Sequence, residues 1–159
     1  MIERPTVEQA IMSALVMQLR IRGGLAGARD TEPPLSGFRS TPLPYAWVCE
    51  DGPSLPEGDM PDINDVYIFR VLPVIVRGVC RCKDEQDAYV KARALDGVLQ
   101  AAVFTDQTLG GLALWSEYTG SEVGPAAESG LAGVEQRWSL HYQRLRMNPY
   151  AQQVDGGGN

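Results

Sequence analysis

The segment from Val66 to Cys82, "VYIFRVLPVIVRGVCRC", constrains the fold more than any other feature, because it is the longest β-rich run in the chain. Side chains of a strand alternate between two faces, and both faces of the first half are largely apolar. We therefore expect something to cover each face there. Pro73 cannot donate to a ladder, so it predicts a bulge, a bend or an edge position that leaves two strands or one kinked strand.

A helix is predicted before this run. Thr6 and Gln9 have the spacing of a capping box, in which each side chain satisfies the other residue's backbone N–H. The apolar stripe that follows consists of Val7, Ile11, Leu15 and Leu19. Cationic residues and Gly23 suit the C-terminus of this helix.

A second helix is predicted directly after the run. Asp84 can cap it, and acidic residues in its first turn match the helix dipole. Its stripe consists of Ala88, Ala92, Leu95, Leu99 and Ala102. Gly97 costs a helix about 1 kcal/mol relative to alanine, so we expect it to mark a tight contact between helix and sheet.

Three further strands complete the predicted fold. They are Tyr45 to Cys49, a segment after Gly110 through Leu112 and Leu114, and the alternating segment from Val134 to Met147. The pattern predicts an α+β fold: a mostly antiparallel sheet of about four strands, with the two helices packed on one face. The chain is long enough for one core, so we expect a single domain over 1–147 and a flexible C-terminal tail over 148–159.

Two long loops interrupt these elements. Residues 23–44 are rich in glycine and proline, so neither a ladder nor a helical turn can extend far, and residues 50–65 are acidic with three prolines. Connections of this length are uncommon in compact domains and are often binding segments. A passive, solvated loop remains the alternative. Asp59, Asp62 and Asp65 lack the spacing of a calcium loop, which argues against a cation site.

The cysteines and the single histidine are candidates for a disulfide, a metal site or a catalytic site. Cys80 and Cys82 share a strand face about 6.6 Å apart, near the upper limit for a disulfide, and could join Cys49 and His141 at a zinc ion. The ligand pairs of zinc sites usually lie in turns, so small buried thiols are the favoured interpretation. Ser139 beside His141 lacks the oriented base and oxyanion donors of a nucleophilic site. We therefore expect no enzyme activity, no metal and no cofactor.

Charge and hydropathy argue against a nucleic-acid-binding protein, a membrane protein and a secreted protein. The formal charge of −6 opposes a sequence-independent grip on nucleic acid. No apolar stretch is long enough to cross a membrane, and the N-terminus lacks the pattern of a signal peptide. Three cysteines fit a reducing compartment. We expect a soluble protein made in the cytoplasm, without a membrane partner.

The order and length of these elements resemble the tail terminator, or tail completion, proteins of long-tailed bacteriophages. The resemblance rests on "DVYIFRVLPVIVRGVC", "DEQDAYVKARALDGVLQAAV", "GGLALW" and "EQRWSLHYQRLRM", spans about residues 5 to 147, and leaves the proline-rich loop unmatched. It implies a ring, commonly of six subunits, that caps the tail tube and offers a docking surface to the head–neck connector. It also implies a location at the tail–neck junction of the virion, assembly in the cytoplasm of the host bacterium, and DNA passing through the lumen without specific binding.

With that resemblance, the two loops become candidate contacts between subunits and with the tube protein or the neck. The candidate interface residues are Arg29, Leu35, Phe38, Arg39, Asp51, Glu57, Asp59 and Asp62. Contacts made by sheet edges are the alternative. Another head–tail joining or neck protein fits the same features, and a small ligand-binding α+β domain, with an apolar pocket and convergent polar groups, is the candidate from a different class.

Overall fold

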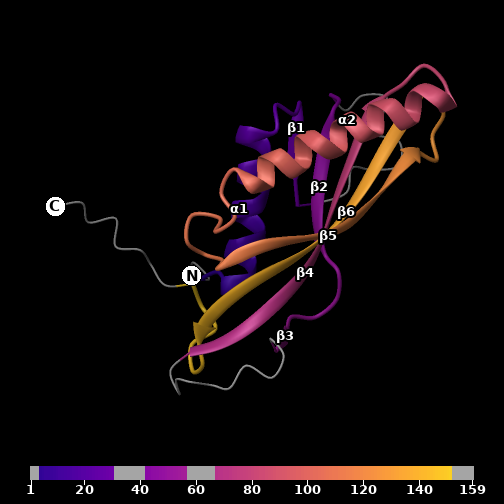
Figure 1. Cartoon of the computed structure of the whole chain (residues 1–159). Helices are drawn as coiled ribbons and strands as arrows, with labels where there is room; N and C mark the ends of the chain where they lie inside the picture. The colour runs from indigo at the N-terminus through magenta and orange to yellow at the C-terminus, as the bar shows by residue number, and fades with distance from the viewer. Residues whose placement is uncertain (1–3, 31–41, 57–66, 152–159) are drawn as a thin grey trace.

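The computed structural model describes residues 4–30, 42–56 and 67–151, and they form one twisted sheet with two helices on one face (Figure 1). The helices are α1 (Val7–Arg22) and α2 (Glu85–Phe104). The strands are β1 (Gly27–Arg29), β2 (Tyr45–Glu50), β3 (Leu55–Pro56), β4 (Tyr67–Arg81), β5 (Trp115–Pro125) and β6 (Leu131–Leu145). The predicted α+β class is therefore confirmed. Neither described helix combines the length and hydropathy that crossing a bilayer requires.

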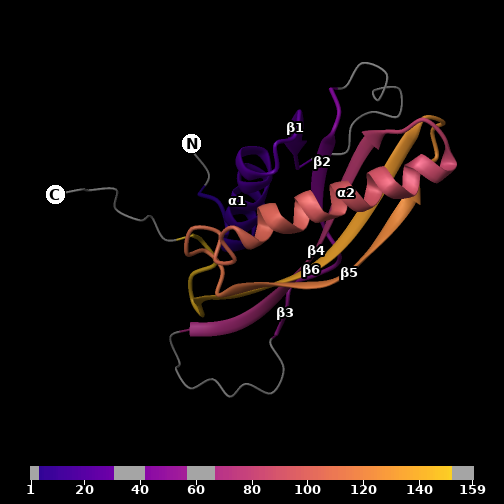
Figure 2. The ribbon, with the colours of Figure 1, turned by 45° about the horizontal axis from the view of Figure 1, so that its top comes forward.

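The sheet is mixed and larger than predicted. Its strand order is β1-β2-β4-β6-β5, with β3 pairing beside β2 on β4. Only β1 and β2 are parallel, and the other pairs are antiparallel. Three of the predicted strands coincide with β2, β4 and β6, whereas the segment predicted through Leu112 and Leu114 lies in the turn before β5. The two additional strands, β1 and β3, have three and two residues and lie in the segments predicted as loops. Figure 2 shows α2 lying across the twisted sheet.

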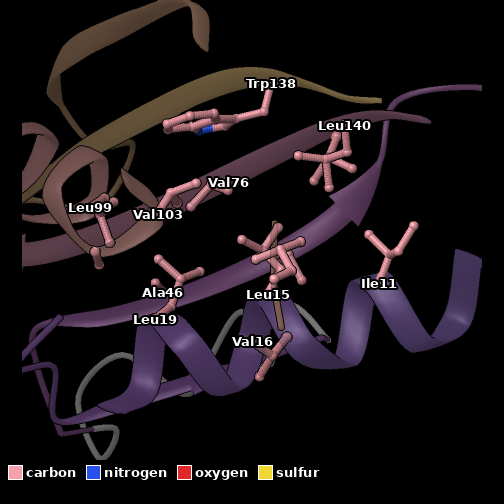
Figure 3. Packing of buried hydrophobic residues seen from close by; sticks show 14 of the residues in the cluster. Ile11, Leu15, Val16, Leu19, Ala46, Val76, Leu99, Val103, Trp138 and Leu140 are labelled. Carbon is pink, nitrogen blue, oxygen red and sulfur yellow. The ribbon is translucent and has the colours of Figure 1, made fainter. Parts of the chain in front are cut away.

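The first helix forms as its sequence predicts. The backbone N–H of Gln9 donates to the Thr6 hydroxyl at 3.2 Å, and the Thr6 N–H donates to the Gln9 side chain at 2.9 Å, which completes the capping box. The predicted stripe is buried, and Gly23 follows the last turn. Figure 3 shows Ile11 and Leu15 pointing from α1 toward the sheet, where they join the main core.

The second helix begins at its predicted cap, since the Asp84 carboxylate accepts the backbone N–H of Asp87 at 2.7 Å. Its predicted stripe is buried. The prediction for Gly97 was wrong: this glycine faces outward, and a Cβ there would meet nothing within 4 Å. The close helix–sheet contact occurs at Gly78 of β4, under Leu95 and Leu99.

The long strand β4 is unbroken across Pro73, contrary to the predicted bulge or division. Its register with β6 runs without a shift from Tyr67 to Arg81. The Pro73 carbonyl accepts the Asp51 N–H at 2.8 Å. Within a strand, the backbone nitrogen and the carbonyl of one residue face the same neighbouring strand. The Pro73 nitrogen, which has no hydrogen to donate, therefore faces the gap between β3 and the end of β2 at Glu50. Pro73 thus occupies a local edge, one of the predicted alternatives, and costs no ladder bond.

The core lies between the helices and the even-numbered side chains of β4 and β6. Trp138, Leu140 and Tyr142 are fully buried there, as their alternation predicts. A small cluster of Tyr45, Trp47, Val79 and Leu131 packs on the opposite face. In the first half of β4, Tyr67 to Val71 are only half-buried, so the expected cover on both faces is incomplete.

The two ends of the described chain pair with each other. The Val7 N–H donates to the Pro149 carbonyl at 3.0 Å, and the Ala151 N–H donates to the Pro5 carbonyl at 3.0 Å. This bridge includes residues 148–151 of the predicted tail, while 152–159 lie outside the described residues. The strand predicted from Gly110 begins later, at Trp115, because Gly110 and Gly111 adopt positive φ angles in a turn.

Candidate functional site

The three cysteines and the histidine are divided between the two faces of the sheet. The register places Cys49 and His141 on the face away from the helices, which we name the open face, whereas Cys80 packs on the helix side with Cys82. The described part of the chain contains no group of three or more His, Cys, Asp and Glu that could hold a metal. Burial, with a smaller contribution from Cys82, raises the pKa of the Cys80 thiol, which disfavours the reactive thiolate.

His141 is part of an aromatic and acidic contact on the open face. Its ring stacks on Trp115 with centroids 4.1 Å apart, and its Nε2 lies 2.8 Å from a Glu117 carboxylate oxygen. Ser139 shares the open face, opposite Glu117 in the register. The geometry joins β5 to β6 through side chains and leaves Trp115 40% exposed. An exposed aromatic ring held rigidly suits contact with another protein.

A row of charges crosses the centre of the open face. Arg77 Nε contacts one Glu135 oxygen at 3.0 Å, and Arg137 contacts the other at 3.3 Å. Burial opposes ionisation of Glu135, but the hydrogen bonds from both arginines outweigh it and lower the pKa of the carboxyl. Both guanidinium groups thus share one carboxylate on a surface that neither described helix covers.

A hollow of about 630 Å³ lies beside this row. Its lining includes Trp47, Arg77, Tyr89, Glu122 and Pro125, which come from three strands and α2. Aromatic, proline and charged groups therefore meet at one end of the sheet. Such a mixture can receive a side chain of a protein partner, while the described lining offers no convergent catalytic set.

A partly buried polar cluster contacts the segment that leads from β2 into the acidic loop. The Tyr142 hydroxyl donates to Glu8 at 2.6 Å and lies 2.6 Å from the Ser54 hydroxyl. Arg70 donates to both the hydroxyl and the carbonyl of Ser54, at 2.9 and 2.7 Å. Burial, followed by the bond to Glu8, raises the pKa of Tyr142 to about 12, so the phenol stays protonated at neutral pH.

Two of the predicted interface residues lie in the described chain. Arg29 is exposed at the end of β1, and Asp51 is exposed just after β2. No ion pair joins these two residues to each other. The other six, Leu35, Phe38, Arg39, Glu57, Asp59 and Asp62, lie outside the described residues. Asp65, the third aspartate of the cation site that the sequence argued against, lies outside them as well.

Sequence reasoning missed the cluster around Tyr142. The alternation of β6 placed this tyrosine on the buried face, and a buried phenol usually needs a polar partner, so one signal was present. The partners Glu8, Ser54 and Arg70 are far away in the sequence and belong to no motif. The sequence predicts the need for a partner there, but not the partner's identity.

Comparisons with known proteins bear on the fold alone. No protein-family model matches the chain, and no curated protein matches it. Among solved structures, the chain is similar to a chain of the "Virion of native gene transfer agent (GTA) particle", with a TM-score of 0.51 and 13% sequence identity. The match covers 87% of this chain and 98% of the other. The likeness therefore extends over nearly the whole of a subunit taken from a virion.

Proposed function

We propose that this chain is a structural virion protein that forms a ring, acts as the tail terminator, and works by presenting surfaces rather than by catalysis. The observation that carries the proposal is the fold likeness to a chain of a gene transfer agent virion, which covers 98% of that chain. The order of sequence elements independently resembles phage tail terminators. A phage-like structural role accounts for both.

The surfaces of the chain support an assembly role. Neither described helix covers the open face, which displays the Trp115 ring and the charge row. The hollow of about 630 Å³, lined partly by Tyr89 of α2, lies beside that row. The cluster around Tyr142 anchors the start of the acidic segment to the core. Unlike patches on one subunit can close a ring when the rotation between neighbours permits it.

In this proposal the ring has six subunits, caps the tail tube and receives the head–neck connector at the tail–neck junction. The tube protein and the connector are its partners, and the ring assembles in the bacterial cytoplasm before joining the virion. Each copy carries a formal charge of −6, so acidic groups at the lumen would keep passing DNA from adhering to the wall. No residue has a catalytic role in this proposal.

Electron microscopy of particles made without this protein tests the function. We expect overlong or ragged tail tubes that fail to join heads, and restored particles when the wild-type gene is supplied. Tails of normal length joined to heads would contradict the terminator role. Tubes of normal length that lack heads would instead indicate a neck component.

A deletion tests the loop contacts. Because Ala28 of β1 is buried, the deletion should be confined to residues 31–40 and bridged by a glycine–serine linker. We expect the monomer to keep its circular dichroism spectrum and the ring to be lost. An intact ring would assign the contacts to other surfaces, such as the sheet edges.

A further inference from the structure

Arg144 near the end of β6 has an unusual environment for an arginine. Its Nε is buried and has no hydrogen-bond partner. One terminal nitrogen, NH1, donates to the Leu145 carbonyl at 3.3 Å, a long contact. None of the carboxylates in the described chain forms an ion pair with this guanidinium. The Arg144 guanidinium is thus charged, and its Nε–H has no acceptor.

The side chain lines a hollow of about 260 Å³, which we name the Arg144 hollow. Its walls come from the start of α1, the start of β4, the turn before β5 and the paired chain ends, and they are mainly apolar. The lining residues include Val7, Tyr67, Leu112, Leu114, Leu145 and Tyr150. A planar cation within apolar walls matches a carboxylate that has an aliphatic group beside it.

A partly buried arginine without a carboxylate partner lowers the stability of the monomer, because desolvation of its Nε donor is not offset by a hydrogen bond. A methionine would fill similar volume without that cost. The arrangement becomes favourable if a carboxylate enters the hollow and accepts the free N–H groups in a bidentate pair.

We propose that the Arg144 hollow binds a carboxylate side chain presented by a second copy of the chain. The inference rests on the proposed ring function, in which each subunit contributes one patch and receives another. The acidic segment from Glu50 to Asp65 supplies the complementary charge, because it contains six acidic residues and no basic one. Two of its acids precede aliphatic residues directly, in the pairs Asp59-Met60 and Asp62-Ile63. The acidic segment of one copy therefore matches the apolar, cationic hollow of the next.

The first experiment titrates a labelled peptide of residues 50–65 into the full-length protein and follows fluorescence anisotropy. Arg144→Met is the test variant. Arg146→Met is the matched control, because Arg146 is exposed and does not line the hollow. We expect Arg144→Met to weaken peptide binding at least tenfold and Arg146→Met to change it less than threefold. A peptide with every acid replaced by its amide should not bind.

The second experiment measures subunit assembly by mass photometry and stability by thermal unfolding. Arg144→Met should raise the concentration needed for ring formation at least tenfold, while its unfolding temperature stays equal to or above that of the wild type. A fall of several degrees would mean that Arg144 is paired within its own chain and would overturn the inference.

The outcomes separate the two proposals. Rings that form equally well with Arg144→Met overturn the inference and leave the ring function standing. Arg144-dependent peptide binding without rings at any concentration counts against the ring and supports the hollow as a carboxylate site. Absence of both peptide binding and rings overturns both.

Discussion

Gly78 of β4 lies directly beneath Leu95 of α2: a Cβ at this glycine would be only 3.0 Å from the Leu95 Cδ2. The same position would approach Leu99 at 3.0 Å and Val134 at 3.1 Å. These leucines of α2 thus pack close to β4 at a position that carries no side chain.

Alanine at two glycines should have opposite effects. Gly78→Ala overpacks this contact and should lower the free energy of unfolding by about 1 to 3 kcal/mol. Gly97→Ala is the matched control, since a Cβ there meets nothing and the helix propensity improves, which should stabilise the protein by up to about 1 kcal/mol. Urea unfolding measures both changes. Equal effects would mean that the helix does not pack on Gly78.

The effect of a proline in β4 on stability should depend on which neighbouring strand its nitrogen faces. Pro73→Val should change the free energy of unfolding by less than about 1 kcal/mol, because the restored N–H faces the gap beside β2. Val74→Pro should cost more than about 1 to 3 kcal/mol, because it removes a donor facing β6 and leaves a carbonyl unpaired. Chemical denaturation of the two variants tests this, and a severe loss in Pro73→Val would contradict the edge position.

The phenol of Tyr142 should make stability sensitive to alkaline pH. Its pKa is raised from 10.0 to about 12, so the folded state retains a proton that the unfolded state releases first. The contribution is complete below about pH 10 and is lost as the pH rises toward 12. Tyr142→Phe should remove that part of the pH dependence and cost about 1 to 3 kcal/mol at pH 8, because Glu8 loses its donor. Tyr150→Phe, at an exposed tyrosine, is the control, and an unchanged alkaline profile in Tyr142→Phe would refute the assignment.

Glu135 should contribute to stability on the acidic side. Its pKa is lowered from 4.5 in the folded protein, so its contribution is present above that value and is lost as the pH falls through the lower folded pKa. Glu135→Gln should therefore flatten the fall in stability below pH 4.5, and Glu122→Gln, at the opposite residue of β5, provides the comparison. Thermal unfolding from pH 3 to 7 measures the difference.

Local patterns predicted most of the fold. The capping box at Thr6, the stripe of α2 and the alternation of β6 each depend on neighbours within one element, so the sequence contains the whole signal. The parallel pairing of β1 with β2 depends on where a three-residue segment is placed by the rest of the chain. Gly97 illustrates the same limit, because a glycine within a helical pattern does not indicate which face of the helix it occupies, and this one faces outward.

The candidate site was less predictable because its contacts join distant residues. Glu8 and Tyr142 are 134 positions apart, and no spacing rule connects them. The open face was partly foreseeable, since Arg77 and Arg81 made one side of the β run polar in its second half. Six of the eight predicted interface residues lie outside the described chain, so those assignments stay predictions.

The bridge between Pro5 and Ala151 brings both ends of the described chain to one place. A reporter domain joined directly at Pro5 or at Ala151 would consequently emerge beside Tyr150, at the rim of the Arg144 hollow. A circular permutant, closed by a short peptide across this bridge and reopened in a distant turn, would move such a fusion to another side of the subunit.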